Sequence, residues 1–273
     1  MYIYQLQKAG CHVTAVCRSN FDVIKQQGFQ LTSVRFGFQQ YTPDRVVRDA
    51  AECSEDVYDF IVVCTKSFPE IKPSLLDILQ PVLTGRPDTA VVLAQNGINI
   101  EGEIAAAFPD NPVLSGVVYC PAIQTAPGHI DYSEMLSLLE LGTFPSDAPS
   151  RHKAAAVVFV NLMIDGGGGG EHHDNIQVAR WSKLLMNAPW NPITALTLCT
   201  DGDFLLTSEP FALELVWDCM LEVMAVAKAL GIPGVTEDVA RKKLSISTKR
   251  AETGTGREMS MLVKPMGIMV LRG

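Results

Sequence analysis

The stretch Tyr58-Asp-Phe-Ile-Val-Val-Cys-Thr-Lys66 decides how the first half of this chain folds. Its centre is an unbroken run of apolar and β-branched residues, which is typical of a β-strand. The run does not alternate with polar residues, so the strand is expected to be buried on both faces, as in a parallel sheet covered by helices. The polar pair Thr65-Lys66 then marks the end of the strand.

Two further runs, at residues 12–17 and 89–94, predict strands of the same kind. Helical patterns lie before, between and after the three predicted strands, at residues 1–10, 71–83 and 101–107. Strands that alternate with helices indicate a parallel sheet with helices on its faces. We therefore predict an α/β Rossmann-type domain. Residues 113–141 add further strands, with a turn at Pro127-Gly128.

Polar side chains follow each of the three predicted strands. They are Arg18, the pair Thr65-Lys66, and the run Gln95-Asn96-Gly97. In open parallel sheets ligands bind at the carboxyl ends of the strands, so these groups predict a nucleotide crevice. An arginine at the end of the second strand of such a fold accommodates the 2′-phosphate of NADP, so Arg18 predicts NADP. A solvated surface arginine is the competing interpretation.

A glycine-rich turn should follow the first strand of this fold and open the first helix. The sequence starts inside that helix, so we expect a chain truncated at its N-terminus. The loss of a central strand would expose the edges of its two neighbours. The glycine run at residues 166–170 has no strand and helix around it and is expected to be a flexible connector.

From residue 174 the pattern becomes helical, so we expect domains at residues 1–173 and 174–273. Within residues 180–195, Lys183, Asn187 and Asn191 recur at every fourth position. Each step of four advances about 40° around a helix, so these side chains form one narrow polar stripe. Pro189 predicts a kink or break within this helix. Residues 210–231 and 236–246 predict two more helices.

Lys183 is the reactive group of this stripe. Its neighbours are largely apolar, and burial of an amine disfavours the charged form and lowers its pKa, which suits a lysine to proton transfer. A helix with one solvated face is the alternative interpretation of the pattern.

The composition excludes several classes of partner. The 273 residues carry a formal net charge of −8, with a pI near 5.1. Nucleic acids and anionic membranes require a basic surface, so neither is expected. Seven scattered cysteines indicate buried thiols in a reducing compartment, and no signal or membrane-spanning segment is found, so a cytoplasmic protein is predicted. His172 and His173 are adjacent and point to different sides, and no metal is predicted.

The order of these motifs along the chain resembles that of the ketopantoate reductases (2-dehydropantoate 2-reductases). The motifs are the strand followed by Arg18, Thr65-Lys66, Gln95-Asn96-Gly97, the Lys183/Asn187/Asn191-Pro192 block and Ser260-Met261-Leu262. The resemblance implies an NADP-binding Rossmann domain, then a helical domain, with the active site in the cleft between them. It also implies reduction of ketopantoate to pantoate, a precursor of pantothenate and coenzyme A. A homodimer is among the expectations for its assembly.

The resemblance also implies roles for single residues. Lys183 would be the general acid, and Asn96 would lie near the nicotinamide and the substrate. Lys66 would lie near the cofactor, and the substrate would be bound by Asn187, Asn191 and Ser260. The family places a glutamate about a dozen residues after its serine motif, whereas residues 264–273 of this chain contain no acid. We therefore expect a C-terminus that diverges from the family.

Two other interpretations of the sequence remain open. In the first, the chain is a reductase of another branched 2-keto acid, since nothing in the sequence fixes the side-chain pocket. In the second, it is a non-catalytic remnant of the family. Binding and oxidation of NADPH separate these classes.

Overall fold

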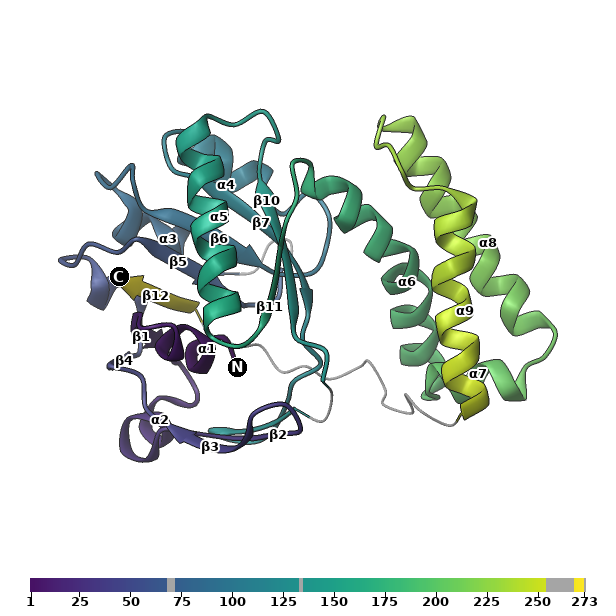
Figure 1. Ribbon diagram of the computed structural model, residues 1–273, viewed down its shortest axis with the longest axis horizontal. Helices are drawn as coiled ribbons and strands as arrows, with labels where there is room; N and C mark the ends of the chain where they lie inside the picture. The colour runs from purple at the N-terminus through teal and green to yellow at the C-terminus, as the bar shows by residue number, and fades with distance from the viewer. Residues whose placement is uncertain (68–71, 133–134, 254–267, 273) are drawn as a thin grey trace. The chain divides into compact units, whose positions relative to one another are not determined.

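The computed structural model describes residues 1–67, 72–132, 135–253 and 268–272. The chain forms two compact units, one of Met1–Ile176 with Lys264–Gly273 and one of Gln177–Val263. The expected division at residues 173 and 174 falls beside this boundary, whereas the C-terminal tail belongs to the first unit. Figure 1 shows the sheet of the first unit and the helices of the second.

The first unit is built on an eight-stranded sheet in the order β11-β10-β7-β6-β5-β12-β1-β4. The strands are β1 His12–Val16, β4 Arg45–Val47, β5 Phe60–Val63, β6 Ala90–Ala94, β7 Val113–Tyr119, β10 Leu138–Thr143, β11 Gly169–His172 and β12 Ile268–Arg272. The pairs β1/β4, β5/β6 and β6/β7 are parallel. The predicted Rossmann-type parallel core is thus confirmed.

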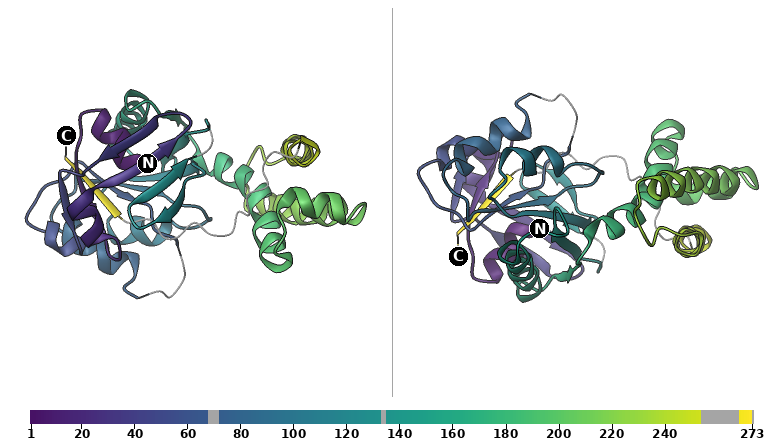
Figure 2. Two further views of the ribbon diagram at one scale, coloured as in Figure 1. Left: turned by 90° about the horizontal axis from the view of Figure 1, so that it is seen from below. Right: turned by 90° about the horizontal axis from the view of Figure 1, so that it is seen from above.

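Helices cover both faces of this sheet (Figure 2). They are α1 Tyr2–Lys8, α2 Phe21–Gln27, α3 Leu75–Leu83, α4 Gly102–Ala107 and α5 Ser150–Asp165, with a 3-10 turn η1 at Ala50–Cys53. Val62 and Val92 pack in the cluster that contains α1 and α5, and Ile61 and Val91 in the cluster that contains α3 and α4. Because successive side chains of a strand point to opposite faces, an unbroken apolar run can supply both clusters.

A smaller sheet in the order β3-β2-β9-β8 completes the first unit. Its strands are β2 Phe29–Ser33, β3 Gly37–Tyr41, β8 Ile123–Ala126 and β9 His129–Tyr132. The turn predicted at Pro127-Gly128 joins β8 to β9, and Gly128 has the positive φ of 76° that such a turn favours. The neighbouring strands β2 and β9 of this sheet are parallel.

The C-terminal strand β12 lies between β1 and β5 and runs antiparallel to both. Val270 is the register partner of Thr14 on one side and of Ile61 on the other. The expectation that β1 and β5 would have exposed edges is therefore wrong. The backbone of the divergent tail fills the slot that a parallel first strand occupies in a doubly wound sheet.

The glycine run at residues 166–170 is not a flexible connector, and that expectation is also wrong. Its last two residues begin β11, in which Gly170 pairs with Leu139 of β10. A Cβ on Gly166 would lie 2.2 Å from the backbone oxygen of Gln5 in α1. The glycines let this segment pack closely against its neighbours, and pattern reasoning missed that requirement.

The second unit is helical over its described residues, as predicted. It holds α6 Ile176–Thr197, α7 Asp201–Thr207, α8 Phe211–Ala229 and α9 Glu237–Thr253. The break expected at Pro189 is not found, because α6 continues through Pro189 and Pro192. Leu185 and Ile193, on either side of Pro189, belong to one buried cluster with Val216 and Met220 of α8, so packing outweighs the lost hydrogen bond.

No helix in the described part of the chain is long and apolar enough to cross a membrane.

Candidate active site

The carboxyl ends of β1, β5 and β6 lie at one edge of the large sheet. The strands β5 and β6 are parallel, and β1 has the same direction because β12 runs antiparallel to both β1 and β5. Arg18, Lys66 and Asn96 follow these ends, and all three are exposed. The structure thus brings the three cofactor residues predicted in the first unit to one edge.

Gln95 connects two of these strand ends. Its side chain is only 4% exposed, and its Nε2 donates to the backbone oxygen of Thr65 at 2.6 Å and to its Oγ1 at 3.2 Å. A buried amide that bridges two loops fixes their spacing. Gln95 therefore sets the distance between the segments that carry Lys66 and Asn96.

The loop that carries Asn96 leads to a buried carboxylate that is hydrogen-bonded to the sheet. Glu101 is fully buried at the start of α4, and Ser115 Oγ of β7 donates to its Oε1 at 2.6 Å. Gly97 within this loop has a φ of 115°, a conformation that glycine adopts without strain. Sequence reasoning missed both Glu101 and Ser115, because a hydrogen-bonded pair in adjacent elements leaves no spacing signal.

The turn that follows β1 is held by side chains as well. Asn20 Nδ2 donates to Gln124 Oε1 of β8 at 3.0 Å, and the backbone N–H of Cys17 donates to the oxygen of Val47 at 2.8 Å. Burial raises the pKa of Cys17 to about 11, so this thiol is neutral at physiological pH. Arg18 thus leaves a fixed strand end and points its charge outside the core.

The centre of this edge is formed by β12. Val16 and Val63, the last residues of β1 and β5, both pair with Ile268, the first residue of β12. At this edge, the amino end of β12 therefore lies in the slot between the carboxyl ends of β1 and β5. Arg18 on one side fits a phosphate, and Lys66 with Asn96 on the other fits the nicotinamide half and a polar substrate. Polar and cationic groups thus lie on both sides of the slot.

In the second unit, α6 carries the predicted stripe. Lys183 and Asn187 are half-buried, and Asn191 is exposed. Since the helix is continuous from Ile176 to Thr197, the three side chains lie along one face. Ser260, the remaining predicted substrate residue, lies outside the described residues.

A cluster of titratable side chains lies at the end of the sheet near β11. His173 Nε2 is 3.7 Å from Glu140 Oε1 and 3.5 Å from Glu171 Oε1, and among the described residues these three form the one group that offers metal-ligand atoms within 4.8 Å of one another. An imidazole between two carboxylates is also the geometry of an ion pair. Burial and the charges of Glu140 and Glu171 raise the pKa of Tyr119 to about 12.

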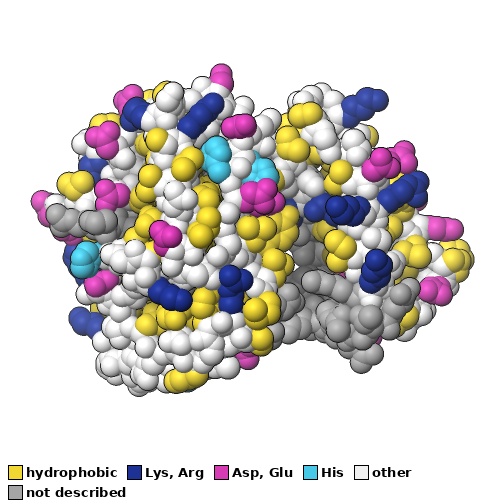
Figure 3. Space-filling view, in the orientation of Figure 1, with side chains coloured by type: hydrophobic (Ala, Val, Ile, Leu, Met, Phe, Trp, Pro, Cys, Tyr) yellow, Lys and Arg dark blue, Asp and Glu magenta, His cyan; other side chains and the backbone are white. Residues whose placement is uncertain are grey.

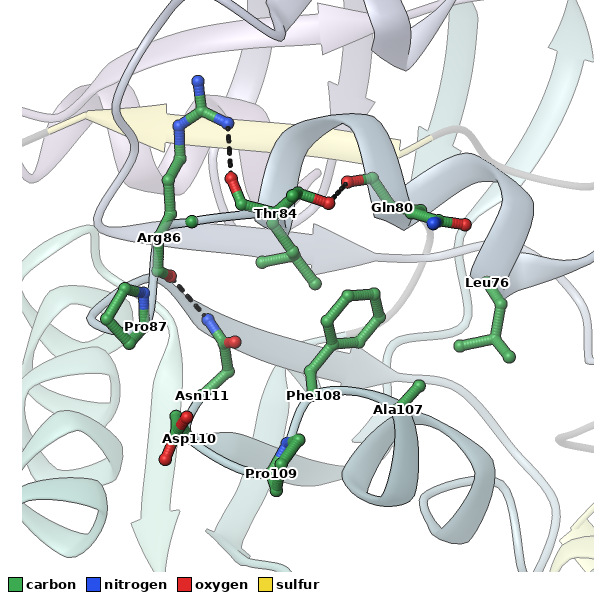
Figure 4. A pocket seen from close by; sticks show the side chains of 12 residues that line it. Leu76, Gln80, Thr84, Arg86, Pro87, Ala107, Phe108, Pro109, Asp110 and Asn111 are labelled. Carbon is green, nitrogen blue, oxygen red and sulfur yellow. Dashed lines mark hydrogen bonds between the residues drawn. The ribbon is translucent and has the colours of Figure 1, made fainter.

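A pocket of about 480 Å³ lies at the opposite edge of the sheet (Figure 4). It is lined by the ends of α3 and α4 and by the loops that lead to the amino ends of β6 and β7. Asn111 Nδ2 donates to the backbone oxygens of Arg86 and Thr89 at 2.7 and 2.8 Å. This polar group holds the loops together, and the pocket is remote from the strand ends that carry Lys66 and Asn96.

The surface charge is mixed. On the face shown in Figure 3, basic and acidic side chains are interspersed, and no continuous basic patch is formed.

A doubly wound sheet with cationic and amide groups at its ligand edge, followed by a helical unit, defines the class of two-domain nucleotide-binding oxidoreductases. Residues 1–146 match the family model described as ketopantoate reductase PanE/ApbA, and residues 175–263 match its C-terminal model. The chain belongs to the ketopantoate reductase family.

Individual proteins resemble the chain over most of its length. An uncharacterized protein of Saccharomyces cerevisiae is 31% identical, over 81% of this chain and 67% of that protein. The crystal structure of 2-dehydropantoate 2-reductase from Methylococcus capsulatus is 33% identical, with a TM-score of 0.75, and the match covers 94% of this chain and 82% of that one. D-mandelate dehydrogenase, solved with NADH and anilino(oxo)acetate, shares the fold at 21% identity, with a TM-score of 0.75, over 94% of this chain and 78% of that one.

Proposed function

We propose that this protein reduces 2-dehydropantoate to pantoate with NADPH, as a step of pantothenate and coenzyme A biosynthesis. The observation that carries the proposal is the family match over both units, joined to the exposed Arg18, Lys66 and Asn96 at one sheet edge. Assembly as a homodimer stays a prediction.

In this proposal each residue has a role that suits the chemistry of its side chain. Arg18 binds the 2′-phosphate that distinguishes NADPH from NADH, and Lys66 contacts the cofactor. Asn96 orients the nicotinamide and the keto group, while Asn187, Asn191 and Ser260 bind polar groups of the substrate. Amides suit this role because they fix an orientation without adding charge.

Lys183 is the catalytic residue of this proposal. NADPH supplies the hydride when it is bound. As the hydride reaches the keto carbon, negative charge grows on the oxygen, and the Lys183 ammonium stabilises that charge and donates its proton to the oxygen. The products are then a 2-hydroxy acid and a neutral lysine, which regains a proton from solvent. The half-buried position of Lys183 on α6 supports this role.

A reductase of another branched 2-keto acid is the second candidate. It is favoured by the shared fold of D-mandelate dehydrogenase, which was solved with anilino(oxo)acetate and not with a pantoate analogue. One fold can serve several 2-keto acids because the side-chain pocket, and not the cofactor edge, selects among them.

The test compares Lys183→Ala with the matched variant Lys242→Ala, which removes the same charge from an exposed position on α9. NADPH affinity is followed by nicotinamide fluorescence, and turnover by the loss of NADPH with ketopantoate or with 2-ketoisovalerate. Lys183→Ala is expected to lower kcat by about 10²–10⁴-fold, the usual contribution of a general acid, with NADPH affinity nearly unchanged. Lys242→Ala should retain both properties.

Each other result has a definite meaning. Equal turnover of wild type and Lys183→Ala contradicts the role of this lysine. Faster turnover of 2-ketoisovalerate than of ketopantoate supports the second candidate. An absence of NADPH binding at millimolar concentration identifies a non-catalytic remnant.

A further inference from the structure

A second arginine follows the strand next to Arg18. The strands β1 and β4 are parallel, with Val16 paired to Val47 in the register. The N–H of Cys17 donates to the oxygen of Val47 at 2.8 Å, so the two backbone segments are still side by side where they leave the sheet. Arg48 follows β4 directly, and Arg18 stands two residues after β1, one position further along than Arg48 in the register. Both side chains are exposed at the ligand edge.

Helix α2 holds the guanidinium of Arg48 in place. The guanidinium carbon lies 4.1 Å from the centre of the Phe21 ring, and Nη2 is 2.6 Å from Asp22 Oδ1. Phe21 belongs to the turn after β1, since its N–H donates to the oxygen of Arg18 at 3.4 Å. The Phe21 ring therefore connects the backbone of Arg18 to the side chain of Arg48.

Three basic side chains lie around Phe21, together with acids. Lys25 Nζ lies 5.2 Å from the centre of the same ring, so Arg18, Lys25 and Arg48 surround one short segment. Two acids contact Arg48: Asp22 Oδ1 accepts from a single guanidinium nitrogen at 2.6 Å, and Glu52 Oε1 accepts from the backbone N–H of Arg48 at 2.8 Å. A guanidinium has five N–H donors, so the contact with Asp22 leaves donors for a second acceptor.

We propose that Arg48 is a second determinant of cofactor choice, which binds the 2′-phosphate of NADPH together with Arg18. A phosphate monoester carries close to two negative charges at neutral pH, and one guanidinium neutralises only half of them. Guanidinium groups bind phosphate oxygens through paired hydrogen bonds, and a stacked guanidinium loses little freedom when it does so. This inference rests on the proposed NADPH-dependent function and names a residue that strand position alone does not predict.

Arg45 provides a matched control on the same strand. It stands at the amino end of β4, and its Nη1 lies 2.6 Å from Asp56 Oδ2, the same distance that separates Arg48 from Asp22. The two arginines have similarly exposed side chains, 45% and 55%. Arg45→Gln thus removes an equal charge and an ion pair of the same length from the opposite edge of the sheet, together with a hydrogen bond from Nη2 to the backbone oxygen of Glu52.

The experiment measures dissociation constants of NADPH and NADH for wild type, Arg18→Gln, Arg48→Gln and Arg45→Gln, by fluorescence and without substrate. Arg48→Gln should weaken NADPH binding about tenfold, as expected for loss of a charge-assisted hydrogen bond, while NADH binding changes by less than about twofold. Arg45→Gln should leave both constants near those of wild type. Thermal unfolding of each variant shows that the fold is retained.

The outcomes separate this inference from the proposed function. If Arg18→Gln weakens NADPH binding and Arg48→Gln does not, the role of Arg48 is overturned and the cofactor assignment stands. If Arg48→Gln weakens NADPH and NADH equally, Arg48 has only a structural role in holding α2. If wild type does not prefer NADPH to NADH, the cofactor assignment itself is overturned.

Discussion

Asp44 joins three parts of the chain at the start of β1. Its Oδ2 accepts from the backbone N–H of Val13 at 2.7 Å and from Gln7 Nε2 at 3.3 Å, and its Oδ1 lies 3.5 Å from His12 Nδ1. Partial burial acts to raise the pKa of this carboxyl group, but the hydrogen bonds from Val13, His12 and Gln7 outweigh it and lower the pKa below its ordinary value. The charged form is therefore stabilised by folding.

Asp44→Ala is expected to lower the free energy of unfolding at pH 7 by about 1 kcal/mol, because the N–H of Val13 loses its acceptor and the carboxylate is partly exposed to screening solvent. The pKa of Asp44 is depressed in the folded state, so the stabilisation that depends on its charge is complete above the unfolded pKa of about 4. This stabilisation is lost as the pH falls through the pKa of the folded state. The difference between wild type and variant should thus shrink from pH 6 to pH 3 in urea titrations.

Asp88→Ala is the control for this measurement, because the Asp88 side chain is 97% exposed and faces Arg151 at 3.7 Å. It should change stability little at either pH. A constant difference between wild type and Asp44→Ala at all pH values would contradict the assigned pKa shift.

Single residues could be predicted from the sequence where strand position alone decides their place. Arg18, Lys66 and Asn96 follow apolar runs, and parallel strands bring such positions to one edge. Arg48 and Glu101 could not be predicted in the same way. The short strand β4 has only three residues, and the side-chain partners of Arg48 in α2, Asp22 and Phe21, lie 26 and 27 positions away, so no local pattern signals the contact.

At the scale of elements, the segment that leads from α5 into β11 shows where composition misleads. A run of five glycines is typical of a flexible linker, but here close backbone contacts require the glycines. The opposite error occurs in α6, where Pro189 indicates a break that the packing of Leu185 and Ile193 prevents. In both elements tertiary contacts override a local preference, which sequence patterns cannot report.

Gly166→Ala tests the packed state of this segment. The added Cβ would lie 2.2 Å from the backbone oxygen of Gln5, and a backbone atom cannot move aside as a flexible side chain can. Overpacking of this kind costs about 1–3 kcal/mol, which urea unfolding would show as a lower midpoint. Gly102→Ala is the control, since its Cβ would meet only Asn99 Oδ1 at 3.4 Å and alanine favours the first turn of α4. Equal stability of both variants would restore the flexible interpretation.

At the scale of the whole molecule, the order of the chain and the order of the fold differ. The first unit is made of Met1–Ile176 and the C-terminal tail, so the helical unit is inserted within it in sequence. The alternation of strands and helices predicted the fold class, but nothing in residues 264–273 indicates which two strands they join. A single five-residue apolar strand carries no information about its partners, because pairing between distant segments is decided by the vacant edges of the folded sheet.

The last prediction concerns this closing strand. Because β12 has a neighbour on each side, the backbone N–H of Val270 points toward a paired strand, and proline there removes that donor from the middle of a sheet. Val270→Pro is expected to lower the stability of the first unit by about 3 kcal/mol, a typical cost of proline within regular structure. Val270→Thr, which keeps the donor and the β-branched shape, should change it much less.

A chain that ends at Val263 lacks β12 altogether, so the first unit should lose more stability than it does in Val270→Pro. The edges of β1 and β5 would then be uncovered, and exposed edges promote aggregation, so dye binding and light scattering should rise at moderate temperature while helical circular dichroism from α6–α9 persists. Wild-type stability of both Val270→Pro and the shortened chain would show that β12 does not close the sheet.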